Sequence, residues 1–368
     1  MNTLAYWVGF NIVRGIGPTR LRALLDAFGD VEHAWHAPAE ALVRAGLDRR
    51  SLENLLKARA TLDLERELER VAAAGAHVLT WESDDYPHLL REIPDPPPVL
   101  YVRGQLRGDE WMLGVVGTRR ASVYGRQVTR RLVTALARSG VTIVSGLARG
   151  IDAEAHRAAL DAGGRTVAVL GHGVDLVYPP EHRLLAEEIV AHGALVSDYP
   201  VGTKPEGVNF PPRNRLISGM SLGVLVTEAG LRSGARITAD FAAEQGREVF
   251  AVPGSILAAG SAGTNALIQE GARLVASVQD ILEELNLVQV AVQTEARQVL
   301  PADATEANLL SHLSFEPVHV DELQQQVGMP IAQVTSTLAL MELKGLVRQV
   351  GGMRYVVSRE PGVEYVVG

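Results

Sequence analysis

The sequence contains no cysteine among its 368 residues. Without thiols the chain cannot form disulfide bonds or sulfur-ligated zinc and iron–sulfur sites, so we expect a reducing, cytoplasmic compartment and no metal centre. No apolar run approaches the roughly 18 residues of a membrane-spanning helix. Residues 1–10 also lack the basic start of a signal peptide. We therefore expect no membrane association.

Several catalytic and nucleotide-binding signatures are missing too. The sequence has no Gly-Lys dipeptide, which excludes a Walker A phosphate loop, and it has no HExxH zinc-protease motif. The stretch Gly117-Thr118-Arg119-Arg120 follows an apolar run but does not match the GxGxxG fingerprint of dinucleotide-binding proteins. We identify no catalytic residue and expect neither a cofactor nor enzymatic activity.

Charge is modest overall and unevenly placed. The formal net charge is −8, which argues against a protein that binds nucleic acid with its whole surface. Residues 113–150, however, contain no Asp or Glu and seven arginines, namely Arg119, Arg120, Arg126, Arg130, Arg131, Arg138 and Arg149. Such a run is a candidate footprint for a polyanion. A solvated helix face is the alternative, since only three of the 35 basic residues are lysines.

A chain of this length, with 47% hydrophobic residues, predicts two or three folded domains. Residues 1–62 are expected to form a small helical domain of the helix-hairpin-helix or SAM-like kind. The segment Val13–Leu21 has an apolar-Gly-apolar-Gly turn, and Pro18 is a good first residue for the next helix. A weaker second turn follows at Ala45–Leu47. Such turns donate backbone N–H groups to DNA phosphates, but the same unit also serves as a protein-contact domain.

Residues 63–288 alternate short Val-rich runs with helical stretches. The predicted strands span 77–81, 99–102, 113–116, 141–144, 166–170, 194–197, 223–227, 248–252 and 273–275. Buried parallel strands have this composition, and the pattern predicts an α/β fold, an extended Rossmann-like, doubly wound and mostly parallel sheet. Ligands of such sheets bind beyond the C-terminal ends of the strands.

Residues 289–303 lose this pattern and are predicted to be a linker. Residues 304–368 are predicted to form three helices and a β-hairpin, which is the arrangement of a winged helix. Winged helices that bind DNA are anchored by basic side chains, whereas residues 301–358 contain three basic and six acidic residues. We therefore expect this domain to contact protein or to bind DNA weakly.

Five predicted turns at the C-terminal ends of strands or crossovers carry the candidate site residues. In chain order they are Gly117, Thr118 and Arg119; Ser145, Gly146 and Arg149; Asn209, Phe210, Arg213, Asn214 and Arg215; Ser233, Gly234 and Thr238; and Gly263, Thr264 and Asn265. Small residues, hydroxyls and guanidinium groups before a helix suit phosphate binding, and a phenylalanine beside arginines suits a stacked base. Because the turns share one sheet edge, they predict a continuous rim that binds single-stranded nucleic acid.

Several residues also have plain structural interpretations. His156, on a predicted helix among alanines, is more simply a packed or capping residue than a ligand. Asp152 and Glu228 are more simply helix caps than an acid–base pair. Phe210, followed by two prolines, is also compatible with core packing. The Ser233-Gly234 and Gly263-Thr264 turns are also compatible with tight connections.

An ordered set of motifs runs along the chain: Tyr86-Pro87…Pro98-Val99-Leu100-Tyr101, Gly117-Thr118-Arg119, Ser145-Gly146…Gly150-Ile151-Asp152…His156, Phe210-Pro211…Arg213-Asn214-Arg215, Ser233-Gly234…Thr238-Ala239 and Gly263-Thr264-Asn265-Ala266-Leu267-Ile268. Through these motifs the chain resembles the DprA/Smf family of DNA-processing proteins over nearly its whole length. The resemblance implies a homodimer that binds single-stranded DNA, shields incoming DNA in natural transformation and delivers it to a RecA-type recombinase without catalytic turnover.

Carried over by position, the resemblance makes Arg119 the phosphate-binding arginine and Phe210 the base-stacking aromatic residue. Family members often have a lysine three residues before that phenylalanine, where this chain has Gly207. Lys204 is then the candidate for binding the phosphate that the family's lysine would bind. For the implied dimer contact we consider a cluster of apolar side chains near the end of the sheet domain, Ile281, Leu282, Leu285 and Leu287.

A nucleotide-hydrolysing enzyme, such as a Rossmann-like nucleoside-monophosphate hydrolase, is the alternative function. Such an enzyme needs a carboxylate near the sugar beside a glycine-rich phosphate loop. Glu228, followed by Ala-Gly-Leu-Arg-Ser-Gly, matches this requirement only in part, and no second acid is paired with it. A transcription factor built around the winged helix is a third interpretation, which leaves the central domain unexplained.

Overall fold

The structure is a computed structural model, and it describes residues 2–287, 304–314, 317–343, 346–350 and 352–357. The chain forms two compact units, Met1–Ile281 and Leu282–Gly368. The predicted linker, 289–303, and residues 358–368 of the predicted winged helix lie outside the described residues. None of the described helices is long and apolar enough to cross a membrane.

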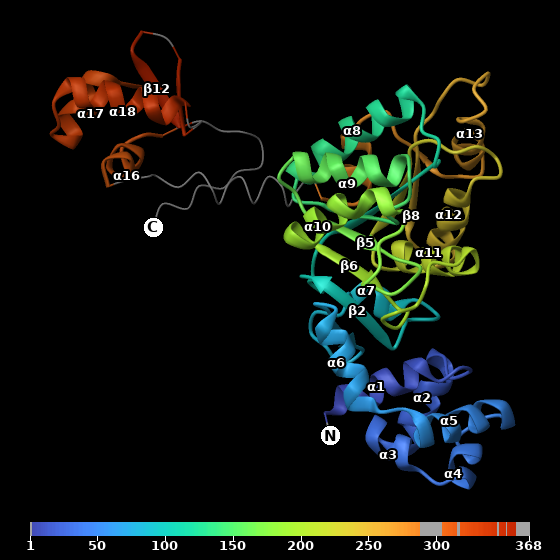
Figure 1. Cartoon of the computed structure of the whole chain (residues 1–368). Coiled ribbons are helices and arrows are strands. Elements are labelled where there is room, and N and C mark those ends of the chain that lie inside the picture. The colour runs from blue at the N-terminus through green and yellow to red at the C-terminus, as the bar shows by residue number, and fades with distance from the viewer. Residues whose placement is uncertain (1, 288–303, 315–316, 344–345, 351, 358–368) are drawn as a thin grey trace. The chain divides into compact units, whose positions relative to one another are not determined.

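A nine-stranded sheet is the centre of the first unit (Figure 1). Its strands are β1 (His77–Thr80), β2 (Val99–Gly104), β3 (Met112–Val116), β4 (Thr142–Ser145), β5 (Thr166–Val169), β6 (Ala194–Ser197), β7 (Gly223–Val226), β8 (Glu248–Ala251) and β9 (Arg273–Leu274). Their spatial order is β1-β2-β6-β5-β4-β3-β7-β8-β9. Strand β2 runs antiparallel to both β1 and β6, and the other pairs are parallel. The predicted Rossmann-like, mostly parallel sheet is therefore confirmed.

Helices cover both faces of this sheet (Figure 1). One face carries α8 (Val123–Arg138), α9 (Ile151–Asp161) and α10 (Arg183–His192), and the other carries α11 (Phe210–Gly219), α12 (Gly234–Glu244) and α13 (Ala262–Gln269). The shorter helices are α7 (His88–Glu92), η1 (Pro180–His182), η2 (Gly207–Asn209) and α14 (Val278–Glu284). The strand order reverses between β3 and β7. In doubly wound sheets such a reversal leaves a crevice at the C-terminal strand ends, where ligands bind.

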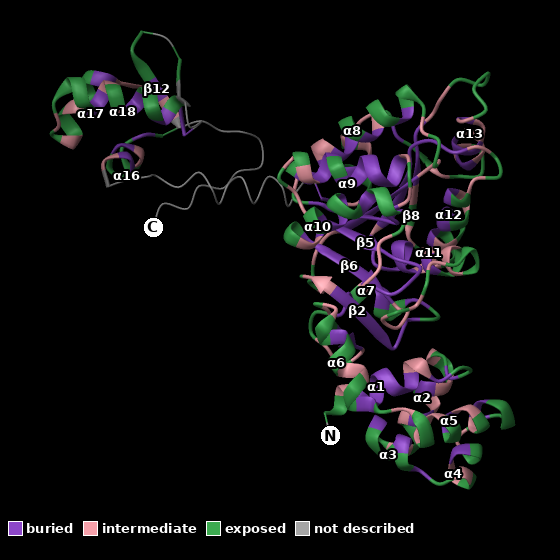
Figure 2. Cartoon of the chain, viewed as in Figure 1, coloured by how far each residue is buried: buried purple, intermediate pink, exposed green. Residues whose placement is uncertain are grey.

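The strands next to this reversal are buried because helices cover them on both sides (Figure 2). Strands β3 to β7 are buried along their whole lengths, as their runs of Val, Leu, Ile and Ala predict. Each fully buried Val or Leu side chain contributes about 1.5–3 kcal/mol to folding. The strand ends are thus a rigid support for the turns that follow them.

The apolar cluster that we considered for dimerisation lies inside this unit and the start of the next. Ile281 and Leu282 of α14 are 0% and 8% exposed, and Leu287 is 6% exposed. Leu285 is half-buried, so the cluster offers little apolar surface to a second copy, and a dimer contact through it stays a prediction.

Six helices precede the sheet: α1 (Thr3–Ile12), α2 (Pro18–Phe28), α3 (Val31–His36), α4 (Ala39–Arg44), α5 (Arg49–Thr61) and α6 (Leu64–Ala73). The two predicted hairpin turns connect α1 to α2 and α4 to α5. Helix α2 starts at Pro18 and buries Leu21 and Leu24, as the helical spacing predicts.

The helical part and the sheet share one hydrophobic core. Trp7 of α1 packs edge-on against Trp81, with ring centroids 5.8 Å apart. The side chain of Asn11 links the two parts, since its Oδ1 accepts from the Tyr101 hydroxyl at 3.0 Å and its Nδ2 donates to the Asp198 carbonyl at 3.4 Å. These contacts fix the helical part against β2 and the loop after β6.

The second unit has the predicted winged-helix arrangement in its described part. Its helices are α16 (Ala304–Ser311), α17 (Val320–Val327) and α18 (Ile331–Leu343), and its strands are β10 (Val318–His319), β11 (Val347–Gln349) and β12 (Arg354–Val357). The strands form an antiparallel sheet in the order β10-β12-β11. A small core that includes Leu309, Leu323 and Leu338 holds the helices together.

Candidate nucleic-acid interface

A pocket of about 410 Å³ opens beyond the C-terminal end of β3, at the strand reversal. It is lined by the turn after β3, part of the turn after β4, and the starts of α11 and α12. Nine predicted site residues contribute to its wall: Gly117, Thr118, Arg119, Phe210, Arg213, Asn214, Ser233, Gly234 and Thr238. The structure therefore brings four of the five predicted turns together around one cavity.

Two glycines allow the first turn to approach its neighbours closely. A Cβ atom on Gly117 would lie 2.5 Å from the side chain of Ile151. Gly150 has a φ of +79°, and its Cβ would meet the carbonyl oxygen of Thr118 and lie 2.7 Å from the carbonyl carbon of Arg119. The Thr118 amide donates to the Glu228 carbonyl at 2.7 Å. The backbone of this turn is thus held between α9 and the turn after β7.

Arg119 is exposed at the edge of the pocket. Its guanidinium carbon lies 5.9 Å from the centre of the Phe210 ring. Within the part of the chain that the structure describes, no carboxylate forms an ion pair with it. A guanidinium that is open to solvent beside an aromatic ring provides charge for a phosphate next to a surface for a base.

Phe210 has an aromatic neighbour to which none of the sequence motifs pointed. Tyr178, from the loop after β5, stacks on it with ring centroids 5.8 Å apart and an angle of 26° between the planes. Tyr178 is 43% exposed. The available signal was the Tyr178-Pro179 pair, because it follows another parallel strand that ends at the same sheet edge. Partly exposed, stacked rings of this kind suit unpaired bases.

Arg213 supports the pocket from within. It is 5% exposed, and its guanidinium donates to the carbonyl oxygens of Gly146, at 3.0 Å, and Val169. Burial lowers the pKa of Arg213 to about 10, so the group remains protonated at neutral pH. Its guanidinium carbon also lies 5.9 Å from the Phe210 ring centre. This cation ties α11 to the ends of β4 and β5 and adds positive potential next to the ring.

The two acidic side chains near the pocket bind backbone amides. Asp152 accepts from the amides of Gly146 and Ala148, at 3.1 and 3.3 Å, and burial raises the pKa of its carboxyl group. Glu228 accepts from the amide of Ser122 at 2.9 Å, just before α8. Both carboxylates therefore hold turns in place. Neither is a helix cap, because α9 begins after Gly150 without a side-chain cap and α8 is capped by Ser122, so the helix-cap interpretation was wrong.

Residues 219–223 match the GxSxG pattern that surrounds the nucleophilic serine of many hydrolases. In those enzymes the serine follows a strand, whereas Ser221 precedes β7. Ser221 is fully buried and donates its hydroxyl to the Ile217 carbonyl at 2.7 Å. It is a structural serine.

His156 is a packed residue of α9. Its Nδ1 lies 2.7 Å from the hydroxyl of Thr166, and that hydroxyl donates to the Ile143 carbonyl at 2.8 Å. Nδ1 therefore carries the proton, and the buried Nε2 has no hydrogen-bond partner. Burial lowers the pKa of His156 to about 3, so the ring is neutral at physiological pH. This agrees with the packing interpretation.

The other nine predicted site residues do not line the pocket: Ser145, Gly146, Arg149, Lys204, Asn209, Arg215, Gly263, Thr264 and Asn265. Ser145 is buried and donates to the Val115 carbonyl at 2.6 Å, which links β4 to β3. Arg149 forms an ion pair with Glu181 at 2.5 Å. Lys204 is exposed in the loop before η2.

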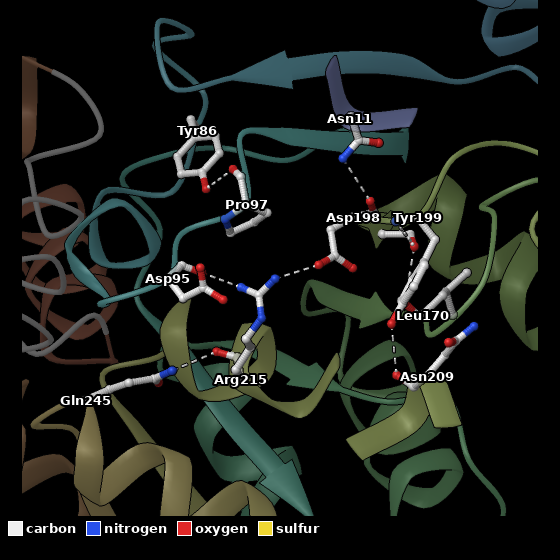
Figure 3. A network of polar contacts seen from close by, with 11 residues as sticks. Asn11, Tyr86, Asp95, Pro97, Leu170, Asp198, Tyr199, Asn209, Arg215 and Gln245 are labelled. Atoms are coloured by element: carbon white, nitrogen blue, oxygen red, sulfur yellow. Dashed lines mark hydrogen bonds and ion pairs between the residues drawn. The ribbon is translucent and has the colours of Figure 1, made fainter. Parts of the chain in front are cut away.

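Arg215 belongs to a structural network (Figure 3). It donates to the Asp95 carbonyl at 2.6 Å and forms an ion pair with Asp198 at 2.7 Å. The next residue, Tyr199, donates its hydroxyl to the Asn209 carbonyl at 3.5 Å. Together with the contact from α1 to Asp198, this network fixes the loop that leads from β6 to α11.

The fifth turn forms a separate loop beside the pocket. The amide side chain of Asn265 accepts from the Gly254 amide at 3.1 Å and donates to the Gly254 carbonyl at 3.0 Å, which closes the loop. The Gly263 amide donates to the Ala229 carbonyl at 2.7 Å. The fifth turn therefore lies next to the fourth, but its residues do not reach the pocket wall.

The seven arginines of residues 113–150 differ in their surroundings. Arg130 on α8 pairs with Glu154 at 2.8 Å, and Arg149 pairs with Glu181, so carboxylates from outside this segment neutralise part of its charge. Arg119 and Arg120 line the pocket. Arg126, Arg131 and Arg138 of α8 are exposed and have no ion pair with any described residue, so the segment keeps positive charge both at the pocket and along α8.

The chain matches known families and proteins along most of its length. Residues 77–286 match the model of the DNA recombination-mediator protein A family, and residues 293–353 match that of the DprA winged helix domain. Protein Smf of Synechocystis is 39% identical, over 95% of this chain and 98% of its own length. The DNA processing protein DprA of Bacillus subtilis is 45% identical, over 60% of this chain and 76% of its own length.

Solved structures of DNA processing proteins are similar to this chain as well. The DNA processing protein A of Streptococcus pneumoniae is similar with a TM-score of 0.68 and 35% identity, over 76% of this chain and 97% of that one. DNA processing protein A of Helicobacter pylori, whose structure describes a single-stranded DNA binding mode, gives a TM-score of 0.51 and 29% identity, over 58% and 97% of the two chains. On these matches, the chain belongs to the DprA/Smf family of DNA-processing proteins.

Proposed function

We propose that the chain binds single-stranded DNA at the pocket beside β3. The observation that carries this proposal is the exposed guanidinium of Arg119 beside the stacked rings of Phe210 and Tyr178. A positive group alone suits any phosphate, whereas exposed aromatic rings bind bases that are not paired in a duplex. The single-stranded DNA binding mode described for the Helicobacter pylori relative supports the same conclusion.

The pocket residues differ in their proposed roles. Gly117, Thr118 and Arg119 bind a phosphate, and Phe210 stacks on a base. Predicted site residues with buried or paired polar groups support these contacts indirectly; they are Ser145, Arg149, Arg213, Arg215 and Asn265. Lys204, which is exposed near η2, is the candidate for a neighbouring phosphate.

We further propose that the bound strand is shielded from nucleases during natural transformation and is delivered to a RecA-type recombinase in the cytoplasm. The chain acts as a homodimer and without turnover. Membership of a recombination-mediator family supports the delivery role. The engagement of Asp152 and Glu228 with backbone amides supports binding over hydrolysis. In this scheme segments 1–62 and 304–368, which flank the sheet segment 63–288, provide contacts to partners.

The substitution Arg119→Ala in the full-length chain tests the DNA site. The salt slope is the change of the logarithm of the binding constant with the logarithm of the salt concentration. One lost phosphate contact lowers the size of this slope for single-strand binding by about 0.7, which corresponds to about a fourfold loss of affinity at about 0.15 M salt. Fluorescence anisotropy with labelled oligo-dT measures both quantities. Arg138→Ala removes the same charge at the other end of α8 and is expected to leave both unchanged. Equal effects of the two substitutions would refute the assignment of Arg119.

Separate assays test the remaining parts of the proposal. The chain is expected to shorten the lag of RecA-type filament assembly on single-stranded DNA, and Arg119→Ala is expected to lengthen it again. Incubation with nucleoside monophosphates is expected to release no base, and detection of free base would favour the hydrolase alternative.

A further inference from the structure

The first hairpin turn of the helical part packs against the start of α5, which follows the second turn, and a second, separate cavity opens between them. Ser51 of α5 donates its hydroxyl to the Gly15 carbonyl at 3.2 Å, and Asn54 donates to the Arg14 carbonyl at 2.7 Å. The cavity between the turns has a volume of about 690 Å³. It shares no residue with the pocket beside β3.

This cavity is strongly basic in a chain whose net charge is −8. Its wall contains four arginines and one carboxylate, Asp48. Arg20 is paired with that carboxylate, and Arg49 forms an exposed pair with Glu53 at 2.8 Å. Arg14 and Arg50 are exposed and form no ion pair with any residue that the structure describes. The wall therefore presents two unneutralised guanidinium groups.

The backbone of the first turn adds to this positive potential. The carbonyl oxygens of Arg14 and Gly15 already accept hydrogen bonds. Arg20 donates to the Gly15 carbonyl at 2.5 Å, in addition to the bonds from Ser51 and Asn54. Helix α2 then begins at Pro18 without a side-chain cap. Acceptors in the turn are occupied while the first amides of an eleven-residue helix are not capped, which favours an anionic ligand.

The chemistry of the wall also indicates what kind of anion fits. No aromatic side chain lines this cavity, in contrast to the pocket with Phe210. Without a ring there is no stacking surface for an unpaired base, so contacts are limited to phosphates. A site that recognises phosphates alone, from two turns held at a fixed spacing, suits the regular backbone of a duplex.

We propose that the paired turns around Gly15 and Asp48 bind the phosphate backbone of double-stranded DNA through Arg14 and Arg50. This site is independent of the proposed single-strand site. A chain with both sites holds a single strand at the sheet and a neighbouring duplex segment at its helical part.

The full-length double variant Arg14→Ala/Arg50→Ala tests this proposal with a labelled duplex and with oligo-dT. Two lost contacts lower the salt slope of duplex binding by about 1.8, which corresponds to about a 30-fold loss of affinity at about 0.15 M salt. The affinity for short oligo-dT is expected to be unchanged. The control Arg44→Ala/Arg66→Ala removes two exposed arginines that do not line the cavity.

Three outcomes overturn the proposal: no duplex binding by the unmodified chain, a duplex loss no larger than that of the control, or an equal loss of duplex and oligo-dT binding. The variant Arg119→Ala in the same assays distinguishes failure of this proposal from failure of the single-strand site. It is expected to weaken oligo-dT binding and to leave duplex binding unchanged.

Discussion

Acidification is expected to destabilise the first unit through one buried histidine. His156 is fully buried in α9, and its only polar contact fixes the proton on Nδ1. Protonation therefore adds a second proton at Nε2, which is buried and without a partner, and gives the buried ring a positive charge. For this reason burial lowers the pKa of His156 to about 3, whereas an unfolded chain has a histidine pKa near 6.5.

The sign and size of the effect follow from this difference. Because the folded-state pKa is the lower one, the unfolded chain takes up the proton first, and stability is lost as the pH falls below about 6.5. Between about pH 8 and about pH 5 this single group lowers the free energy of unfolding by about 2 kcal/mol. The loss continues towards the folded-state pKa of about 3 and levels off below it.

Urea unfolding followed by tryptophan fluorescence measures the effect. All four tryptophans lie in the first unit, so the signal reports on that unit alone. His156→Asn keeps a donor group near Thr166 but does not titrate. The difference in unfolding free energy between the two proteins cancels the contributions of other ionisable groups. A difference that stays constant between about pH 8 and about pH 5 would show that His156 is not held neutral by burial.

Two further predictions concern the single-strand site. Tyr178→Ala removes a stacking ring and is expected to weaken oligo-dT binding about five- to 150-fold, whereas Tyr178→Phe keeps the ring and the affinity. If Tyr178→Ala also bound an abasic oligonucleotide more weakly than the unmodified chain does, the stacking role would be contradicted. Gly150→Ala forces a Cβ against the Thr118 carbonyl and displaces the turn that we propose to bind phosphate, so single-strand affinity is expected to fall by at least as much as in Arg119→Ala. Gly163→Ala, at a φ of +74° with nothing within 4 Å, has the same backbone strain without the contact and serves as its control in the same anisotropy assay.

The sheet and the place of the site were predictable because parallel strands have a recognisable composition. Short Val-rich runs located each strand, and the C-terminal ends of parallel strands necessarily lie at one edge. The stretch Gly117-Thr118-Arg119 could therefore be placed at the sheet edge where the pocket lies without knowledge of which strands are neighbours. Its prediction needed only the order of strand, turn and helix.

The direction of individual side chains was not predictable in the same way. Arg213 and Arg215 are two residues apart on α11, and positions two apart on a helix point to nearly opposite sides. The sequence contains both as equal candidates, but Arg213 reaches the pocket and Arg215 reaches Asp198. The carboxylate that pairs with Arg149 also comes from a distant segment, at Glu181. Such partners depend on which distant segments the fold brings together, and local sequence patterns do not encode this.

The core shared by the helical part and the sheet has a practical consequence for anyone who divides this chain. A fragment that starts near residue 63 loses Trp7 and Asn11, and it leaves Trp81 facing water and the Tyr101 hydroxyl without its acceptor. The exposed aromatic surface favours aggregation. Fragments of this protein are therefore better cut after the sheet than before it, even though the helical hairpins look like an independent module in the sequence.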